Sequence, residues 1–221
     1  MLVRSFLLQI VFSSIVLSFN VNRSFFATTS NGFETILAKE VSTLPDVQEV
    51  KIGKGSVSFV GSSRSGFSGL LWLRSSLKLM EKLGDTESSR EHEITNMNSI
   101  NSKSDLYNFI ATINWTDLLD VEKTIKCSCV LGEKIPSDLT HSHFSSLTMK
   151  NCIVDQFRER FKMRPNVDIE HPHLPLMLYL HRGEAIIYRI WSGEESMHKR
   201  GYKTDSVIHK ANLRENTAAS L

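Results

Sequence analysis

Strand-like and helix-like patterns of apolar residues alternate in a fixed order between residues 24 and 84. Apolar residues recur at intervals of three and four after Gly32 and again after Ser62, which indicates two helices. Gly53-Lys54-Gly55 separates two strand-like runs and is typical of a hairpin turn. The expected elements are a strand at 24–27, a helix at 33–41, a hairpin at 47–59, a helix at 62–73 and a strand at 77–83. This βαββαβ order predicts a ferredoxin-like domain.

A second series of elements follows between residues 104 and 192. The expected elements are a short helix at 105–113, a strand at 124–131, a long helix at 141–161 and hairpin strands at 176–181 and 185–191. The long helix is predicted to carry its apolar stripe on Leu147, Val154, Phe157 and Phe161. The chain is therefore predicted to be an α+β protein with a ferredoxin-like domain at 24–84 and an α/β domain at 104–192.

Two segments of different composition adjoin these domains. Residues 85–103 are rich in Ser, Asn and Glu and almost free of apolar residues, which favours a flexible insertion. Residues 193–221 are interpreted as a basic linker. The middle of the chain is acidic and its C-terminal part is basic: residues 85–122 carry 8 acidic and 2 basic side chains, and residues 141–221 carry 12 basic and 9 acidic ones. A partner that carries phosphates is expected to be drawn to the ends of the chain.

Residues 1–23 have the character of a leader. The apolar run from Phe6 to Phe19 is 14 residues long and contains serines, which is too short and polar for a stable membrane span. The segment has no acid, and Asn20-Val21-Asn22 offers no small-residue cleavage site. We therefore favour a transit peptide over a signal peptide, with an aberrant start as a third alternative. The expected location is an organelle, chloroplast or mitochondrion, with the cytoplasm as the alternative, and no stable membrane insertion is expected.

Four cations and one acid lie at the end of the long predicted helix. Two interpretations remain open: a patch that contacts phosphates, or cations that stabilise the C-terminus of any helix. Lys150 falls within the predicted apolar stripe, where it either snorkels at the edge of the core or faces the backbone of a nucleic acid. The cations at the helix end are Arg158, Arg160, Lys162 and Arg164.

The basic linker contains a second candidate RNA-binding segment. Cations and an aromatic ring in this arrangement could hold a phosphate backbone and stack a base, although a basic surface loop has the same composition. Its candidate residues are Lys199, Arg200, Tyr202 and Lys203.

No residue pattern predicts a catalytic or metal site. Cys127 and Cys129 are two positions apart on a predicted strand, and two His-x-His pairs occur, but these spacings match no common structural zinc site. Buried cysteines and loop histidines are the preferred interpretation. Glycine-rich nucleotide loops and the G-x-S-x-G motif do not occur in the sequence. We therefore assign no catalytic residue, metal ligand or cofactor to this chain.

Six short blocks in the same order resemble a known family. They are residues 26–34 (FATTSNGFE), 113–116 (INWT), 149–155 (MKNCIVD), 164–168 (RPNVD), 178–181 (LYLH) and 198–202 (HKRGY). Together they resemble the N-terminal half of the THUMP-containing large-subunit rRNA guanine-N2 methyltransferases, from Ser24 to Leu221. The resemblance implies a ferredoxin-like domain followed by a THUMP domain that binds structured RNA, with large-subunit rRNA as the expected partner.

In that family a class I methyltransferase domain follows, with a D-P-x-C-G-S-G type loop for S-adenosylmethionine and an N-P-P-Y type catalytic tetrapeptide. Neither motif occurs in this sequence, whereas residues 213–219 resemble the helix that leads into that domain. The resemblance therefore implies an RNA-binding module that serves a methyltransferase domain in cis or in trans, and it implies S-adenosylmethionine only for that domain. It does not decide whether the polypeptide is part of an enzyme. The alternative is a non-catalytic orphan RNA-binding protein or a degenerate remnant.

Overall fold

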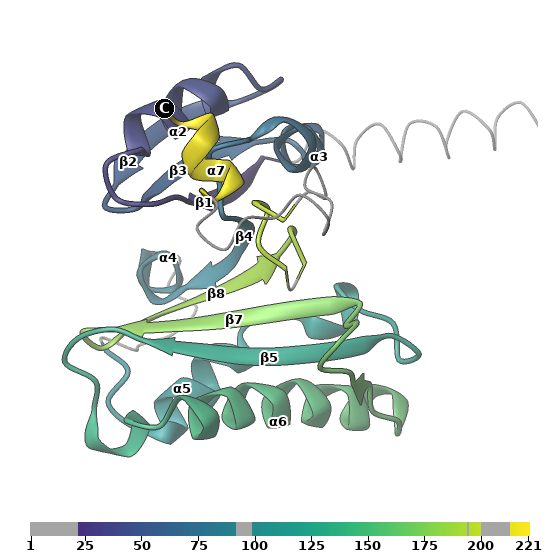
Figure 1. Cartoon of the computed structure of the whole chain (residues 1–221). Helices are drawn as coiled ribbons and strands as arrows, with labels where there is room; N and C mark the ends of the chain where they lie inside the picture. The colour runs from purple at the N-terminus through teal and green to yellow at the C-terminus, as the bar shows by residue number, and fades with distance from the viewer. Residues whose placement is uncertain (1–21, 92–98, 194, 200–212) are drawn as a thin grey trace, which may run out of the picture. The chain divides into compact units, whose positions relative to one another are not determined.

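The computed structural model describes residues 22–91, 99–193, 195–199 and 213–221. The chain forms two compact units, one of Met1–Glu81 with Glu195–Leu221 and one of Lys82–Glu194. Figure 1 shows the elements of each unit. No helix in the described ranges is long and apolar enough to span a bilayer.

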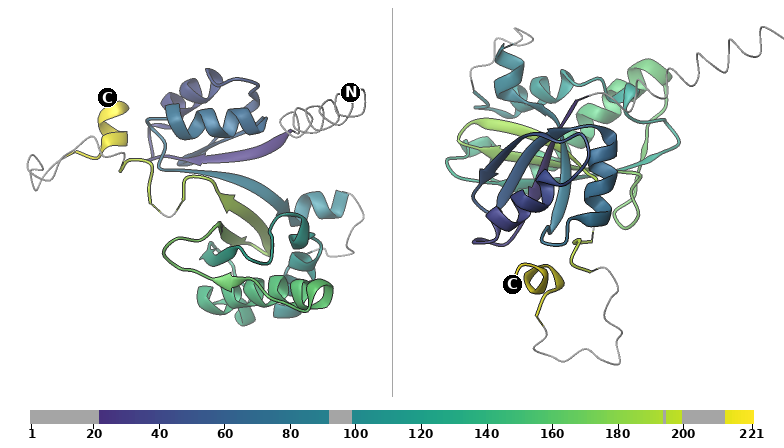
Figure 2. Two further views of the ribbon diagram at one scale, coloured as in Figure 1. Left: turned by 90° about the vertical axis from the view of Figure 1, so that its right-hand side faces the viewer. Right: turned by 90° about the horizontal axis from the view of Figure 1, so that it is seen from above.

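The first unit contains the predicted βαββαβ arrangement. Its strands are ordered β2-β3-β1-β4, and β3 pairs in antiparallel fashion with both β1 and β2. The two helices lie on the same face of this sheet (Figure 2). The elements are β1 (Arg23–Thr28), α2 (Glu34–Ser42), β2 (Gln48–Gly53), β3 (Ser56–Gly61), α3 (Ser63–Trp72) and β4 (Lys78–Asp85). The prediction of a ferredoxin-like domain is confirmed.

Local chemistry explains why these elements begin and pair where they do. Phe25 of β1 lies opposite Phe59 of β3, and their buried rings stack with centroids 5.2 Å apart. The Ser62 side chain accepts hydrogen bonds from the first backbone N–H groups of α3, and the Ser65 hydroxyl accepts one from the Ser62 N–H. This reciprocal cap fixes the start of α3. Gly55 closes the β2–β3 turn with a φ of 65°, a conformation that glycine adopts without steric cost.

The second unit is a sheet with two helices on one face, and the end of β4 contributes its first residues. Its remaining strands are ordered β8-β7-β5-β6, with β5 parallel to both β6 and β7 and with β7 antiparallel to β8. The elements are α4 (Thr86–Glu91), α5 (Lys103–Ala111), η1 (Trp115–Asp117), β5 (Thr124–Leu131), η2 (Ser137–Leu139), α6 (Ser142–Phe161), β6 (Asn166–Val167), β7 (Leu174–His181) and β8 (Glu184–Ile190). A last short helix, α7 (Glu215–Ala219), is assigned to the first unit.

The core of the second unit lies between this sheet and helices α5 and α6. Leu174, Leu176, Leu178 and Leu180 point inward from β7, and Leu106, Phe109 and Ile110 face them from α5. Helix α6 contributes Met149, Cys152, Ile153 and Phe157.

The predicted apolar stripe of α6 was partly wrong. Val154 and Phe157 are buried, but Leu147 and Phe161 are 37% and 42% exposed. Residues 147, 154 and 161 are seven apart and form one row along the helix, whereas the core row passes through Met149, Cys152 and Ile153. The core row is buried throughout, whereas the other row is buried only at Val154, and periodicity alone does not show this difference because both rows are apolar.

The prediction of a flexible insertion at 85–103 did not anticipate helix α4. Asp85 accepts hydrogen bonds from the backbone N–H and the hydroxyl of Ser88, at 2.7 and 3.0 Å, and so caps this helix. The buried Thr86 hydroxyl accepts a hydrogen bond from the Ala185 N–H of β8 at 3.2 Å. Residues 92–98 lie outside the described residues.

Part of the predicted basic linker is docked on the first unit. The Met197 N–H and the Ser196 hydroxyl both donate hydrogen bonds to the Leu77 carbonyl, at 2.8 and 2.9 Å. The Met197 side chain is buried. These contacts fix residues 196 and 197 at the start of β4.

Candidate nucleic-acid interface

The four predicted cations gather at the C-terminal end of α6, which we call the α6 end and define as residues 158–164. The helix terminates at Lys162, which adopts the left-handed conformation with a φ of 56° and donates its N–H to the Arg158 carbonyl at 3.0 Å. The end of a helix carries partial negative charge on its free carbonyls. Cations at this position are therefore favoured by the helix itself as well as by any external phosphate.

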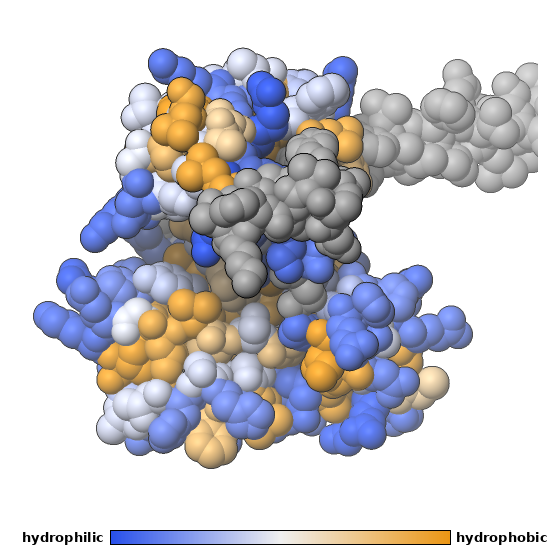
Figure 3. Space-filling model, in the orientation of Figure 1, coloured by the Kyte–Doolittle hydropathy of each residue, from blue (hydrophilic) through white to orange (hydrophobic). Residues whose placement is uncertain are grey.

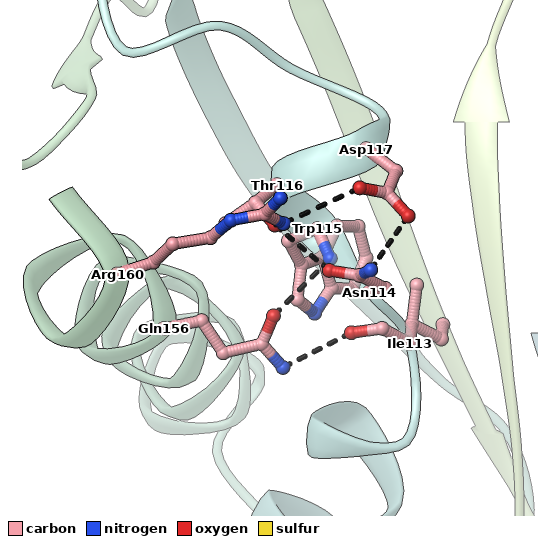
Figure 4. A network of polar contacts seen from close by, with 7 residues as sticks. All are labelled: Ile113, Asn114, Trp115, Thr116, Asp117, Gln156 and Arg160. Carbon is pink, nitrogen blue, oxygen red and sulfur yellow. Dashed lines mark hydrogen bonds and ion pairs between the residues drawn. The ribbon is translucent and has the colours of Figure 1, made fainter.

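Arg160 is held by the segment that precedes β5. Its Nη1 donates to the Thr116 hydroxyl and lies 3.4 Å from an Asp117 carboxylate oxygen (Figure 4). Its guanidinium also lies over the Phe161 ring, 5.4 Å from the centroid. About half of the Arg160 side chain is exposed. These polar contacts use one of its nitrogens, so the guanidinium is oriented and still faces solvent.

Gln156 fixes the same segment to α6 through three hydrogen bonds. Its amide oxygen accepts from the Trp115 N–H at 3.1 Å, and its amide nitrogen donates to the carbonyls of Ala111 and Ile113 at 3.1 and 3.0 Å (Figure 4). Trp115 is fully buried, and its indole N–H donates to the Ile110 carbonyl at 3.0 Å. The block Ile113–Thr116, one of the six blocks that resemble a known family, is therefore a structural anchor for the α6 end.

The other cations of the α6 end are more loosely held. Arg158 lies 3.7 Å from Asp155 in an exposed ion pair, which in solution contributes little to stability. The Lys162 ammonium donates to the Glu159 carbonyl at 3.3 Å, and Arg164 is exposed. Such side chains can exchange their present partners for a phosphate at small cost. The acids among them reduce the local positive potential.

Exposed apolar side chains accompany these cations, a feature that the sequence analysis missed. Phe161 is partly exposed, and three large apolar residues after the helix are more than half exposed: Met163, Val167 and Ile169. Figure 3 shows hydrophobic residues in patches among hydrophilic ones on the visible face of this unit. Exposed apolar residues beside cations are common at binding interfaces. The one feature of the sequence that could have indicated their exposure is their position after the predicted end of the helix.

The loop after α6 is ordered by polar contacts. The Asp168 carboxylate accepts hydrogen bonds from the backbone N–H groups of His171 and Glu170, both at 2.9 Å, and these bonds hold the pKa of Asp168 below its ordinary value. The Lys126 ammonium donates to the Ile169 carbonyl at 2.8 Å. The α6 end therefore continues into a loop with a defined backbone.

Lys150 is not part of the α6 end. It lies two helical turns before Arg158, about 12 Å along the axis, and is half-buried. Burial raises the pKa of the Cys127 thiol to about 12, and the nearby positive charge of Lys150 opposes this shift. Lys150 thus lies beside strand β5.

The second candidate segment is described only in part. Lys199 is exposed and lies 3.9 Å from Glu195, in the first unit. The other three predicted residues of this segment, Arg200, Tyr202 and Lys203, lie outside the described residues.

The cysteines of β5 face the core. Cys127 and Cys129 pack against the buried cluster, and burial raises the pKa of Cys129 to about 11. The described residues contain no group of three or more His, Cys, Asp or Glu side chains that could hold a metal ion.

Comparison with known domain families identifies both units. Residues 24–79 match the RlmL ferredoxin-like domain and residues 101–189 match the THUMP domain. The chain is thus a protein that joins an RlmL-type ferredoxin-like domain to a THUMP domain, as the resemblance implied.

Among curated proteins, the chain is similar to ribosomal RNA large subunit methyltransferase K/L. It is 31% identical over 197 residues to the protein of Syntrophotalea carbinolica and 32% identical over 198 residues to that of Desulfotalea psychrophila. These alignments cover 89% and 90% of this chain, which spans only a quarter of the length of either relative.

Solved structures share the fold. The chain superposes on a protein of Listeria monocytogenes, described as a predicted N6-adenine-specific DNA methylase, with a TM-score of 0.74 and 19% identity. The match covers 93% of this chain and 49% of that one.

Proposed function

We propose that this chain is the RNA-binding module of an rRNA methyltransferase-like protein. In this proposal the THUMP domain positions structured rRNA for a methyltransferase domain outside this chain. The observation that carries it is the pairing of a THUMP domain with an RlmL ferredoxin-like domain in one chain similar to two rRNA large subunit methyltransferases. The names of these relatives favour large-subunit rRNA as the partner.

The α6 end is the proposed contact surface. Double-stranded RNA is recognised mainly through its shape, its phosphates and its 2′-hydroxyl groups, which suits a cluster of exposed cations on an ordered helix end. Arg158, Lys162 and Arg164 are proposed as phosphate contacts, because their side chains are exposed and weakly held. Arg160 is proposed as a fourth contact whose orientation is set by Thr116 and Asp117. The further candidates remain Lys150, Lys199, Arg200, Tyr202 and Lys203.

The methyl donor would belong to the other domain. S-adenosylmethionine is proposed as the cofactor of that domain, present in cis or in trans, while this chain contributes the placement of the RNA. An organelle remains the predicted location, and residues 1–21 of the leader at 1–23 that suggests it lie outside the described residues. The alternatives of an orphan RNA-binding protein or a remnant differ from the proposal in whether a methyltransferase domain acts together with this chain.

RNA binding over a range of salt concentrations tests the proposal. The full chain and the Arg158→Ala/Arg164→Ala variant are titrated with a paired hairpin from large-subunit rRNA. Because each phosphate contact releases counterions, the double variant should lower the slope of log K against log salt by about 1.5–2. A charge-matched control is Lys51→Ala/Lys54→Ala, at exposed positions of the β2–β3 hairpin. An equal loss of slope in both variants would contradict the assignment of the α6 end, and no binding by the wild-type chain would contradict the function.

A further inference from the structure

A groove crosses the first unit between the C-terminal ends of α2 and α3. Its volume is about 740 Å³. It is lined by Lys39, Glu40 and Thr43 from the end of α2 and by Leu71, Trp72 and Arg74 from the end of α3. None of these residues belongs to the THUMP match or to the α6 end.

Trp72 provides a large aromatic surface at this groove. It is the last residue of α3 and is 70% exposed, while the next residue, Leu73, is fully buried and fixes the helix end to the core. Tryptophan stabilises a fold mainly when its indole ring is buried, so the exposed ring of Trp72 contributes little to the stability of this unit. A solvent-facing indole at a fixed helix end is instead suited to stacking against another planar ring.

Two cations and one acid line the groove. Lys39 and Arg74 are exposed cations. The acid beside them, Glu40, is already engaged, because its carboxylate accepts hydrogen bonds from the Ser75 N–H at 3.0 Å and from the Ser75 hydroxyl at 2.6 Å. Ser75 is fully buried, so these bonds hold the carboxylate toward the protein. An aromatic surface and two cations that line one groove fit a base with its adjoining phosphates better than an apolar peptide.

We propose that this groove binds an unpaired nucleotide of RNA, with the base stacked on Trp72 and neighbouring phosphates contacted by Lys39 and Arg74. The proposal rests on the proposed RNA-binding function and adds a single-strand site on the ferredoxin-like domain. Because stacking tolerates any base, the site selects unpaired over paired RNA with little preference for sequence.

The test compares two RNA probes on the full chain. One is an unstructured ten-nucleotide CAA-repeat RNA, and the other is the fully paired hairpin used above. Trp72→Ala should weaken binding of the CAA-repeat RNA by about tenfold or more and leave hairpin binding unchanged. Trp72→Phe should retain most of the affinity, since it keeps an aromatic face. Phe67→Ala is the matched control, because Phe67 is an exposed aromatic residue of α3 that does not line the groove.

Fluorescence supplies a direct readout of the same site. Trp115 is fully buried, so acrylamide quenching reports mainly on Trp72 and on the half-buried Trp191. Addition of the CAA-repeat RNA should protect the wild-type chain from quenching and should have no such effect on Trp72→Ala. If Trp72→Ala does not fold, Arg74→Ala provides the second variant and should weaken CAA-repeat binding with a smaller salt slope.

The results distinguish failure of the single-strand site from failure of the proposed RNA-binding function. Hairpin binding without CAA-repeat binding, or CAA-repeat binding that Trp72→Ala leaves intact, overturns the single-strand site and leaves the proposed function standing. Failure of the wild-type chain to bind either RNA overturns both. Dimerisation of the wild-type chain that is abolished by Trp72→Ala, without any effect on RNA, would assign the groove to a second copy and also overturn the site.

Discussion

Substitution of Gln156 by Ala is expected to destabilise the second unit through the backbone groups that its amide satisfies. The side chain makes three hydrogen bonds that join α6 to the segment Ala111–Trp115. Two of the bonds are partly buried, and the bond to Ala111 is exposed. With about 1 kcal/mol net for each partly buried bond and about half of that for the exposed one, the expected loss is roughly 2–3 kcal/mol.

Urea denaturation monitored by circular dichroism measures this loss. The midpoint should fall while the m-value stays constant, because the surface exposed on unfolding is nearly the same. Glu159→Ala is the matched control, an exposed position on the same turn of α6, and should change the free energy of unfolding by less than about 0.5 kcal/mol. A loss below about 1 kcal/mol for Gln156→Ala would show that water replaces the amide at these backbone groups. The anchoring role assigned to Gln156 would then be refuted.

Three further substitutions test local features. Lys162→Gly should stabilise the chain by about 0.5–1 kcal/mol in thermal denaturation, because glycine accepts the left-handed helix end at a φ of 56°, yet it should weaken hairpin binding. Burial of Asp85 opposes its ionisation, but hydrogen bonds from Lys82 and Ser88 hold its pKa below the ordinary value of 3.8. The stability that this ionised group contributes is therefore complete above about pH 5 and is lost as the pH falls through the lower folded-state pKa. Asp85→Asn should accordingly flatten the stability–pH curve measured below about pH 5. Ser62→Ala should cost about 1 kcal/mol in urea denaturation through loss of the α3 cap, and an unchanged midpoint would contradict this role.

Elements whose signals are local could be predicted from the sequence. Strand β5 was predicted with its observed bounds at 124–131, and the start of α3 directly after its cap, Ser62, followed from the capping residues. Both depend on neighbours within a few positions, through alternation in one case and through a cap in the other. The β2–β3 hairpin was predicted for the same reason, since its turn residues set the backbone directly.

Features that depend on distant partners could not be predicted. Helix α4 begins at a local cap, Asp85, but its first residue is held by a hydrogen bond between Thr86 and Ala185, 99 residues away, which no local pattern indicates. Likewise, the sequence showed four cations at the α6 end but not that Arg160 would be held by Thr116, 44 residues earlier. The exposure of Trp72 was also beyond sequence reasoning, because an aromatic residue at the end of an amphipathic helix is more often part of the core.

The two proposed sites differ in what they would recognise, and this difference follows from their chemistry. The α6 end combines weakly held cations with one oriented arginine, which suits the regular phosphate spacing of paired RNA. Its one aromatic ring, Phe161, already has the Arg160 guanidinium over it. The groove at Trp72 has the opposite balance, with one broad indole and two cations. A paired RNA segment would suit the first site and an unpaired segment the second, each on its own domain. Neither kind of contact reads base edges, so both sites would rely on little base-specific hydrogen bonding.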